Sequence, residues 1–232
     1  MNLIKKIVIL TGAGISAESG IKTFRDSGGL WENYKIEDVA SPEGFKKNPD
    51  LVYDFYNQRR RQLQSCKPND AHRALTDLEK EFDVTIITQN VDNLHEKAGS
   101  KHIIHIHGEL NKVRSIQNPH LILDWEKDLT QDDRGPHGES LRPHIVWFGE
   151  SVLDMDKAIE ATRRADIFIV IGTSLQVFPA AGLVHYLNFE VQKYLIDPHV
   201  EKISTVSGFE KISEKASIGV PLLVKKLMNG KS

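Results

Sequence analysis

A glycine-rich segment directly after a short apolar run is the most informative feature of the chain. The run Ile7–Leu10 has the composition of a buried strand, and the residues that follow it from Gly12 to Trp31 read GAGISAESGIKTFRDSGGLW. Glycine lets a backbone approach a pyrophosphate closely, and the free N–H groups at a helix start point toward such an anion. The spacing differs from the G-x-G-x-x-G of a dehydrogenase, so the turn alone is a weak signal. Phe24 and Arg25, close behind it, suggest a lid over a bound dinucleotide.

Polar or small residues also follow two other apolar runs, where strands of a sheet would end. Gln89–Asp92 come directly after the run Val84–Thr88. Asn and Asp are favoured at the start of a helix, so a capping role is an equal alternative for them. Gly172–Ser174 follow the run Ile167–Ile171 and offer small hydroxyl side chains and backbone N–H groups. Such groups can hold a phosphate or a ribose.

The segment IHIHGEL contains two histidines whose spacing matters. On a strand, His105 and His107 would face one side and His102 the other. A metal site is one interpretation, but we see no carboxylate or thiol at ligand spacing to complete it. A histidine at a strand end, followed by glycine, is better placed as a general base, because its ordinary pKa lies near neutrality. A surface histidine without a catalytic role is the alternative.

An apolar and aromatic run, PHIVWFGE, spans Pro143–Glu150. One interpretation is a strand of the core. The other is a sheet edge that binds an extended peptide through main-chain hydrogen bonds.

The elements that must position these residues can be predicted from hydrophobic patterning. Five apolar runs have the length and β-branched composition of buried strands: Ile7–Leu10, Val84–Thr88, Ile103–His107, Ile167–Ile171 and Tyr194–Ile196. Helical patterns lie near Ala71–Glu81, Asp156–Arg164, Pro179–Leu187 and Lys215–Met228. Strands and helices that alternate in this way are typical of a parallel sheet covered on both faces. The sequence therefore predicts an α/β fold with a doubly wound parallel sheet.

Ligands of such folds bind beyond the carboxyl ends of the strands, so we expect the loops that begin at Gly12, Gln89, Gly108 and Gly172 to meet at one crevice. Two stretches do not follow the alternation: residues 34–70 look helical and charged, and residues 111–141 look polar and irregular. We expect them to form a smaller inserted module of helical and irregular structure, with boundaries near 34–70 and 111–140. The larger part would comprise approximately 1–33, 71–110 and 141–232, and the whole chain 1–232 would be a single catalytic domain.

Composition narrows the class of protein. The chain has 232 residues, of which 40% are hydrophobic and 27% charged, and its formal net charge is −2. Without a basic excess, a nucleic acid partner is not expected. The first apolar run is too short for a signal peptide, and no stretch approaches the length of a membrane span. A single cysteine, Cys66, excludes an internal disulfide and a cysteine-based zinc site. We expect a soluble, cytoplasmic protein that does not contact membranes.

Five motifs occur in a fixed order: GAGISAESGIKTFR, TQNVDNLH, HIHGEL, VWFGE and GTSL. Together they resemble the sirtuin family of NAD-dependent protein lysine deacylases, from about Ile7 to Val224. The resemblance implies a Rossmann-like sheet beside a smaller module, with NAD as co-substrate in the crevice between them. It also implies that acylated lysine side chains of proteins are the substrates and that His107 is the catalytic base.

The resemblance assigns further contacts residue by residue. In the glycine-rich segment, the residues expected to bind NAD are Gly12, Ala13, Gly14, Ile15, Ala17, Gly20, Phe24, Arg25 and Trp31. Elsewhere they are Gln89, Asn90, Val91, Asp92, Gly172, Thr173, Ser174, Asp197 and Ala216. Gln89 and Asn90 would hold the ribose, and Val91 and Asp92 the nicotinamide carboxamide. Val146, Trp147, Phe148 and Gly149 would pair with the substrate peptide.

The implied reaction gives these residue types a role. The acyl oxygen of a modified lysine attacks C1′ of the ribose, and nicotinamide leaves. His107 then accepts a proton from a ribose hydroxyl, which attacks the resulting imidate carbon. Water completes the release of free lysine and O-acyl-ADP-ribose. An imidazole suits the proton transfer because it is mostly neutral at physiological pH.

Tyr56 and Arg59 are three positions apart, so on a helix they share a face. Because Arg60 and Arg61 follow directly, a solvated charged face is the alternative interpretation. The Tyr-x-x-Arg arrangement resembles the sirtuin subgroup that removes succinyl and malonyl groups. A guanidinium binds a carboxylate in bidentate fashion, and a phenol adds one donor. Ala40 aligns with a small residue that leaves room for a longer acyl chain. We therefore expect a desuccinylase and demalonylase with some deacetylase activity.

The chain departs from the family pattern at the metal site of the small module. Most sirtuins bind a structural zinc through four cysteines, and the residues that align with them here are Ser115, Asn118, Asp132 and His137. This set has no thiolate, so no zinc is expected. The apolar segment Leu121–Trp125 is expected to replace the stabilisation that a metal would give. Lys22 stands where proline is usual, and Asp197 where asparagine usually meets the adenine ribose.

Other functions compete with this interpretation. A mono-ADP-ribosyltransferase or NAD hydrolase could use the same NAD pocket, although the peptide-pairing segment argues against both. A dehydrogenase is disfavoured by the glycine spacing. An NAD-sensing or acyl-lysine-binding module without catalysis is disfavoured by the intact His107. We expect a monomer.

Overall fold

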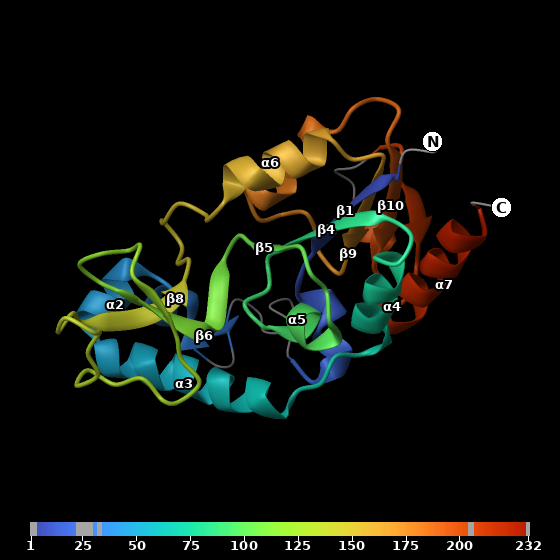
Figure 1. Cartoon of the computed structure of the whole chain (residues 1–232). Coiled ribbons are helices and arrows are strands. Elements are labelled where there is room, and N and C mark those ends of the chain that lie inside the picture. The colour runs from blue at the N-terminus through green and yellow to red at the C-terminus, as the bar shows by residue number, and fades with distance from the viewer. Residues whose placement is uncertain (1–3, 22–29, 32–33, 204–206, 231–232) are drawn as a thin grey trace.

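A six-stranded parallel sheet forms the centre of the larger part of the molecule (Figure 1). The computed structural model describes residues 4–21, 30–31, 34–203 and 207–230. The strand order is β11-β10-β9-β1-β4-β5. The strands are β1 (Lys6–Thr11), β4 (Asp83–Thr88), β5 (Ile103–His105), β9 (Ile167–Ile171), β10 (Gln192–Ile196) and β11 (Glu210–Ile212). The five predicted runs all contribute to this sheet, which confirms the predicted α/β fold.

Helices cover both faces of the sheet, because its central strands bury apolar side chains on both sides. On one face, α4 (Asp70–Leu78) packs against α7 (Ala216–Asn229) over one apolar cluster. On the other, α6 (Met155–Arg163) and the 3₁₀ helix η4 (Ala180–Tyr186) cover a second cluster. The short helix α5 (Leu94–Ala98) follows β4. None of the helices in the described residues is both long and apolar enough to cross a membrane.

The smaller part, at the left of Figure 1, combines helices with an antiparallel sheet. Its helices are α1 (Ile36–Val39), α2 (Pro42–Lys47) and α3 (Pro49–Ser65). Its three-stranded sheet has the order β7-β6-β8, formed by β6 (Gly108–Ser115), β7 (Ile122–Asp124) and β8 (Leu141–Ile145). A two-stranded ribbon consists of β2 (Leu30–Trp31) and β3 (Tyr34–Lys35). The expectation of irregular structure after residue 111 was therefore wrong where β6 and β7 form.

Three element predictions differ from the structure. β5 ends at His105, and His107 lies in the turn that enters β6 at Gly108, whose φ is +83°. The strand expected over 143–150 ends at Ile145, after which the chain turns and Gly149 adopts φ +90°. The predicted helix over 179–187 is the 3₁₀ helix η4.

The smaller part has an apolar core that α3 shares with the antiparallel sheet. Tyr53, Val113, Leu129 and Leu141 are buried there, and Leu123 and Trp125 pack against them. Asn57 clamps the backbone of Leu129: its Nδ2 donates to the carbonyl at 2.9 Å, and its Oδ1 accepts the N–H at 2.8 Å. Of the segment expected to replace a metal, Leu123 and Trp125 join this core, whereas Ile122 is 43% exposed.

Candidate active site

The sheet changes its direction of growth between β1 and β9. From β1 the chain continues to β4 on one side, and from β9 it continues to β10 on the other. The segments that leave the carboxyl ends of these two strands therefore diverge, which opens the crevice where doubly wound folds bind ligands. The glycine-rich segment and the segment 172–174 both start at this point.

Glycine is required where these two segments touch. A Cβ on Gly14 would lie 2.6 Å from the Cα of Gly172, and one on Gly12 would lie 2.7 Å from the Cβ of Thr173. Gly172 has φ +62°, and its carbonyl accepts the N–H of Gly14 at 2.9 Å. The sequence interpretation gave Gly12 and Gly14 only the role of facing a pyrophosphate, and Gly172 only that of holding a phosphate or a ribose. The structure shows that they are also needed for the contact between the two loops.

Two short 3₁₀ helices, η1 (Ala13–Ile15) and η2 (Ala17–Ser19), continue the glycine-rich segment. Ala13 is half-buried and Ala17 is exposed. Ile15 was expected at the cofactor, but its side chain is fully buried in the core beneath the sheet. Its N–H and carbonyl also have partners within the protein, Gly12 and Asn69.

The lid expected over NAD falls mostly outside the described residues. Phe24 and Arg25 lie in the part of the chain that is not described, and of Trp31 only the backbone, in β2, is described. Gly20, at the end of η2, has φ +91° and no atom within 4 Å of a Cβ placed on it. It therefore supplies a left-handed turn that favours glycine.

Three buried polar side chains, those of Ser16, Asn90 and Asp92, are hydrogen-bonded to one another. The Oγ of Ser16 donates to Oδ2 of Asp92 at 2.9 Å, and Nδ2 of Asn90 donates to Ser16 Oγ and to the Gly12 carbonyl, both at 3.2 Å. Asp92 is 5% exposed, and this burial raises the pKa of its carboxyl. Sequence reasoning found Asn90 and Asp92 but gave Ser16 no role, although it lies inside the first motif.

A second polar chain lies beneath this one. The Thr11 hydroxyl donates to Thr88 Oγ1 at 2.8 Å and lies 3.2 Å from Nε2 of His95. Thr88 Oγ1 in turn accepts the N–H of Asn90 at 3.0 Å. Burial holds the pKa of His95 well below its usual value, so its ring is neutral. Sequence reasoning missed this chain, because its members come from β1, β4 and α5.

His107 has the tautomer that a base requires. Its Nδ1 lies 3.0 Å from the Gln89 carbonyl, which can only accept, so Nδ1 carries the proton and Nε2 has a free lone pair. Burial lowers the pKa of His107, which keeps the ring neutral. The Gln89 side chain donates from Nε2 to Thr173 Oγ1 at 3.1 Å. The loops after β4 and β9 are therefore joined next to the base.

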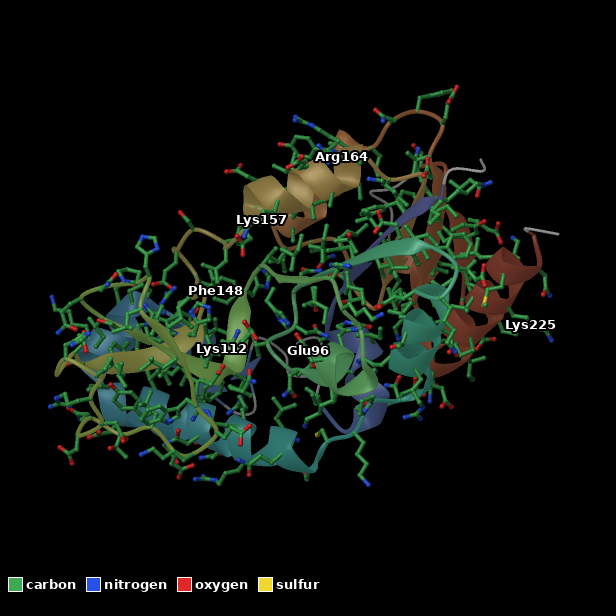
Figure 2. The ribbon with its side chains drawn as sticks, in the orientation of Figure 1. Glu96, Lys112, Phe148, Lys157, Arg164 and Lys225 are labelled. Carbon is green, nitrogen blue, oxygen red and sulfur yellow. The ribbon has the colours of Figure 1, made fainter. Side chains whose placement is uncertain are left out.

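His105 lies in an ion cluster rather than at the crevice. Its Nε2 is 2.6 Å from Oε1 of Glu96, its Nδ1 is 3.3 Å from the Asn90 carbonyl, and Lys112 pairs with Glu109 at 2.8 Å. Figure 2 shows Glu96 and Lys112 on α5 and β6, near this cluster. Ligand atoms of Glu96, His105 and Glu109 lie within 4.8 Å of one another. The sequence indicated no carboxylate at ligand spacing from these histidines, and this expectation was therefore wrong. Each carboxylate nevertheless already has a partner: Glu96 pairs with His105, and Glu109 pairs with Lys112.

Val146–Gly149 were expected to pair with a peptide, but most of their backbone N–H groups already donate to other groups of the protein. The N–H of Val146 donates to the His107 carbonyl at 2.9 Å, and that of Phe148 to the Ala40 carbonyl at 3.0 Å. The N–H of Trp147 donates to Glu150 Oε2 at 2.8 Å. Phe148 is 54% exposed, at the margin of the smaller part (Figure 2), whereas Trp147 is 2% exposed. Main-chain pairing through these three N–H groups would require other bonds to break.

Tyr56 and Arg59 share a buried face of α3. Tyr56 is fully buried, and its hydroxyl oxygen accepts the Nε1–H of Trp147 at 3.0 Å. Arg59 is 9% exposed, and its guanidinium lies 3.3 Å from the centroid of the Phe55 ring. Arg60 is also buried, at 2% exposed. The solvated charged face that we weighed as an alternative is therefore wrong for this part of α3.

The far end of the crevice lies near the carboxyl end of β10. Asp197 is 3% exposed there, and its Oδ1 accepts the N–H of His199 at 2.8 Å. Ala216 is buried at the first position of α7, and the N–H of Ser217 donates to Glu18 Oε2 at 3.1 Å. This bond ties the glycine-rich segment to α7. Ser174 is half-buried beside Thr173.

The four residues that align with the zinc-binding cysteines of other sirtuins do not suit a zinc ion. The Oγ of Ser115 accepts the N–H groups of Gln117 and Asn118, at 3.1 and 3.0 Å, and so closes a turn. Asp132 and His137 are exposed. A hydroxyl and an amide cannot replace the thiolates of a structural zinc site. Within the described ranges, the candidate metal-binding group contains none of these four residues.

Comparison with known proteins agrees with this geometry. Residues 12–179 match the Sir2 family. The chain belongs to the Sir2 family. An NAD-dependent protein deacylase of Bacteroides thetaiotaomicron is 52% identical over 230 residues, which cover 97% of this chain and 98% of the relative.

Solved Sir2 structures have the same fold. A Sir2 homologue in complex with NAD is 37% identical, with a TM-score of 0.85 over 99% of this chain and 91% of that chain. Sir2Tm bound to a propionylated peptide is 28% identical, with a TM-score of 0.77 over 99% of this chain and 94% of that chain. The crevice at β1 and β9, with its glycine contact and buried Asn90 and Asp92, suits a dinucleotide, and NAD is the co-substrate.

Proposed function

We propose that this chain removes succinyl and malonyl groups, and more slowly acetyl groups, from protein lysine side chains with NAD. As a Sir2 family enzyme it is an NAD-dependent protein deacylase. The observation that carries the acyl preference is the burial of Tyr56 and Arg59 on one face of α3, where the Tyr56 hydroxyl contacts Trp147. A buried guanidinium and phenol favour a carboxylate at the end of the acyl chain.

The size of the expected preference follows from hydrogen-bond energies. A hydrogen bond to a charged group contributes about 1.5–3 kcal/mol, which corresponds to roughly a ten- to hundredfold preference over acetyl. Ala40 supports the proposal, because this small residue is buried in the same apolar cluster as Tyr56.

The residues of the crevice suit the proposed chemistry. NAD, when bound, supplies the ribose that receives the acyl group and the nicotinamide that leaves. His107 would take the proton of a ribose hydroxyl at Nε2, while its Nδ1–H stays on the Gln89 carbonyl. Ser16 would keep Asn90 and Asp92 oriented toward the ribose and carboxamide. The products would be nicotinamide, free lysine and O-acyl-ADP-ribose.

The two parts of the chain would divide this work. The larger part, near 1–33, 71–110 and 141–232, would bind NAD. The smaller module, near 34–70 and 111–140, would supply the acyl pocket through α3. The peptide would run along Val146–Gly149, where Phe148 offers an exposed aromatic side chain.

Rates with succinyl-, malonyl- and acetyl-lysine peptides test the proposal. Arg59→Met should reduce kcat/KM for the succinyl peptide by roughly ten- to hundredfold and change the acetyl value much less. Arg61→Met is the matched control, because Arg61 lies on the same helix but is exposed and pairs with Asp128. Unchanged desuccinylation in Arg59→Met would reject the acyl preference. Release of ADP-ribose alone, or its transfer to the peptide, would support the NAD hydrolase or ADP-ribosyltransferase instead.

A further inference from the structure

Arg142, Arg114 and Glu150 form a buried ion cluster next to Trp147, and the proposed chemistry does not use it. Nη1 and Nη2 of Arg142 donate to Oε1 and Oε2 of Glu150 at 2.6 and 2.9 Å, and Nη2 of Arg114 donates to Oε2 at 3.1 Å. The side chains of Arg142, Arg114 and Glu150 are only 10%, 11% and 21% exposed. Buried charges are costly unless their geometry is fixed and well paired, so these three side chains have little freedom to move.

The cluster holds Trp147 from two directions. The guanidinium of Arg142 stacks over the indole, 3.3 Å from the ring centroid. The carboxylate of Glu150, which accepts hydrogen bonds from both arginines, also accepts one from the backbone N–H of Trp147 at 2.8 Å. Phe45 lies 5.2 Å from Trp147 between ring centroids. The plane of the indole and the direction of its Nε1–H are therefore set by the ion cluster together with this aromatic contact.

The fixed orientation of Trp147 in turn determines how the Tyr56 hydroxyl forms hydrogen bonds. Indole nitrogen is a donor only, so the 3.0 Å bond makes the Tyr56 oxygen an acceptor. With that acceptor position filled, the phenol hydrogen must point in another direction. A hydroxyl that already accepts a hydrogen bond is also a stronger donor, because hydrogen bonds in a chain polarise one another.

We propose that Arg142 and Glu150 are positioning residues for acidic acyl groups, and that they act through Trp147 on the Tyr56 hydroxyl. This inference rests on the proposed function and names residues that set its specificity. The two arginines outnumber the one carboxylate, so the cluster also places a net positive charge beside Trp147. An acetyl group has no carboxylate and gains little from either effect.

The first test is the ratio of kcat/KM for succinyl and acetyl peptides in Trp147→Phe. Phenylalanine keeps an aromatic ring but removes the Nε1–H. We expect the ratio to fall about fivefold, mainly through a higher KM for the succinyl peptide, as the loss of one hydrogen bond predicts. Arg142→Lys keeps the positive charge but loses the two parallel hydrogen bonds to Glu150 and the stacking on Trp147. It should therefore also lower the ratio.

Two further variants separate this role from a merely structural one. Tyr53→Phe removes another buried hydrogen bond of α3, from Tyr53 to the Leu141 carbonyl at 2.7 Å, and should keep the wild-type ratio. In a Tyr56→Phe background, Trp147→Phe should cause no further fall in the ratio, because the two residues act through one bond.

The outcomes are distinguishable. A wild-type enzyme without a preference for succinyl over acetyl would overturn the proposed function and this inference with it. If Arg59→Met lowers the ratio but Trp147→Phe and Arg142→Lys do not, only this inference is overturned. Additive effects of Tyr56→Phe and Trp147→Phe, or an equal fall in Tyr53→Phe, would also overturn it.

Discussion

The buried side chains of Ser16, Asn90 and Asp92 depend on one another for their orientation. Ser16 is the shared partner of Asn90 and Asp92, since it accepts from one and donates to the other. Asp92 has little solvent to stabilise its charge, so its orientation depends on the few donors that reach it. Ser16, to which we assign no direct role in the reaction, therefore orients two side chains that we propose contact NAD.

Ser16→Ala tests this dependence. Removing the hydroxyl takes a donor from Asp92 and an acceptor from Asn90, so we expect kcat/KM for NAD to fall by at least about tenfold. The free energy of unfolding should fall by only about 1 kcal/mol. Steady-state kinetics and denaturant unfolding measure both. Ser65→Ala, at an exposed serine whose hydroxyl donates to the Gln62 carbonyl, is the control. Wild-type kinetics in Ser16→Ala would contradict this role.

The sequence predicts such residues when their partners are close along the chain. The shared face of Tyr56 and Arg59 follows from their spacing on a helix. Glu96 on α5 and His105 at the end of β5 are bonded, and neither their spacing nor their residue types indicate this pairing. The same reason explains why Ser16 was missed, since its partner Asp92 is 76 positions away.

At the scale of elements, the smaller part depends on packing and on one amide clamp. Asn57 on α3 binds both backbone groups of Leu129, which is buried in a loop. The loop would otherwise carry a buried N–H and carbonyl without partners, which is costly. The clamp therefore ties the loop between β7 and β8 to α3 without a metal.

We expect Asn57→Ala to lower the free energy of unfolding by about 2–4 kcal/mol, because two buried backbone groups lose their partners. Prolonged treatment with a strong chelator should leave both unfolding and deacylation unchanged. Denaturant unfolding with and without chelator measures the contrast. Gln58→Ala is the control, because Gln58 is the next residue of α3 and its side chain donates to the exposed Asp54. One tightly held zinc per chain, or unfolding on chelation, would contradict the expectation.

Five of the six strands of the parallel sheet could be predicted because each carries its own apolar run, whereas β11, with the sequence Glu-Lys-Ile, carries none. The ends of strands were less predictable. β8 stops at Ile145 although apolar residues continue, because the Trp147 N–H bonds the side chain of Glu150 instead of a neighbouring strand. β7 was not predicted, because a strand of three residues with partly exposed side chains shows little hydrophobic alternation.

Across the whole molecule, buried histidines make stability depend on pH. Burial lowers the pKa of His72 and of His144 to about 4, and holds that of His95 well below its usual value. These residues lie in α4, β8 and α5, so both parts of the molecule are affected. His105 acts in the opposite sense: burial lowers its pKa, but Glu96 outweighs this and raises it.

Between about pH 6.5 and pH 4, the unfolded chain binds more protons at these three histidines than the folded chain does. Stability should therefore fall as the pH is lowered through this range, by at most about 1.4 kcal/mol per pH unit for each histidine. Denaturant unfolding at about pH 7 and about pH 5 measures the slope. His144→Gln should reduce it, and His120→Gln, at an exposed position, should not. A free energy of unfolding that does not change with pH would contradict this account.

The contact between Gly14 and Gly172 restricts how this enzyme can be redesigned. These two loops cannot be exchanged one at a time for loops that carry a side chain at either glycine, because the added Cβ would collide with the backbone of the loop that remains. A graft that alters coenzyme choice must carry both loops together. Libraries aimed at that choice should therefore randomise neighbouring positions and leave this pair of glycines untouched.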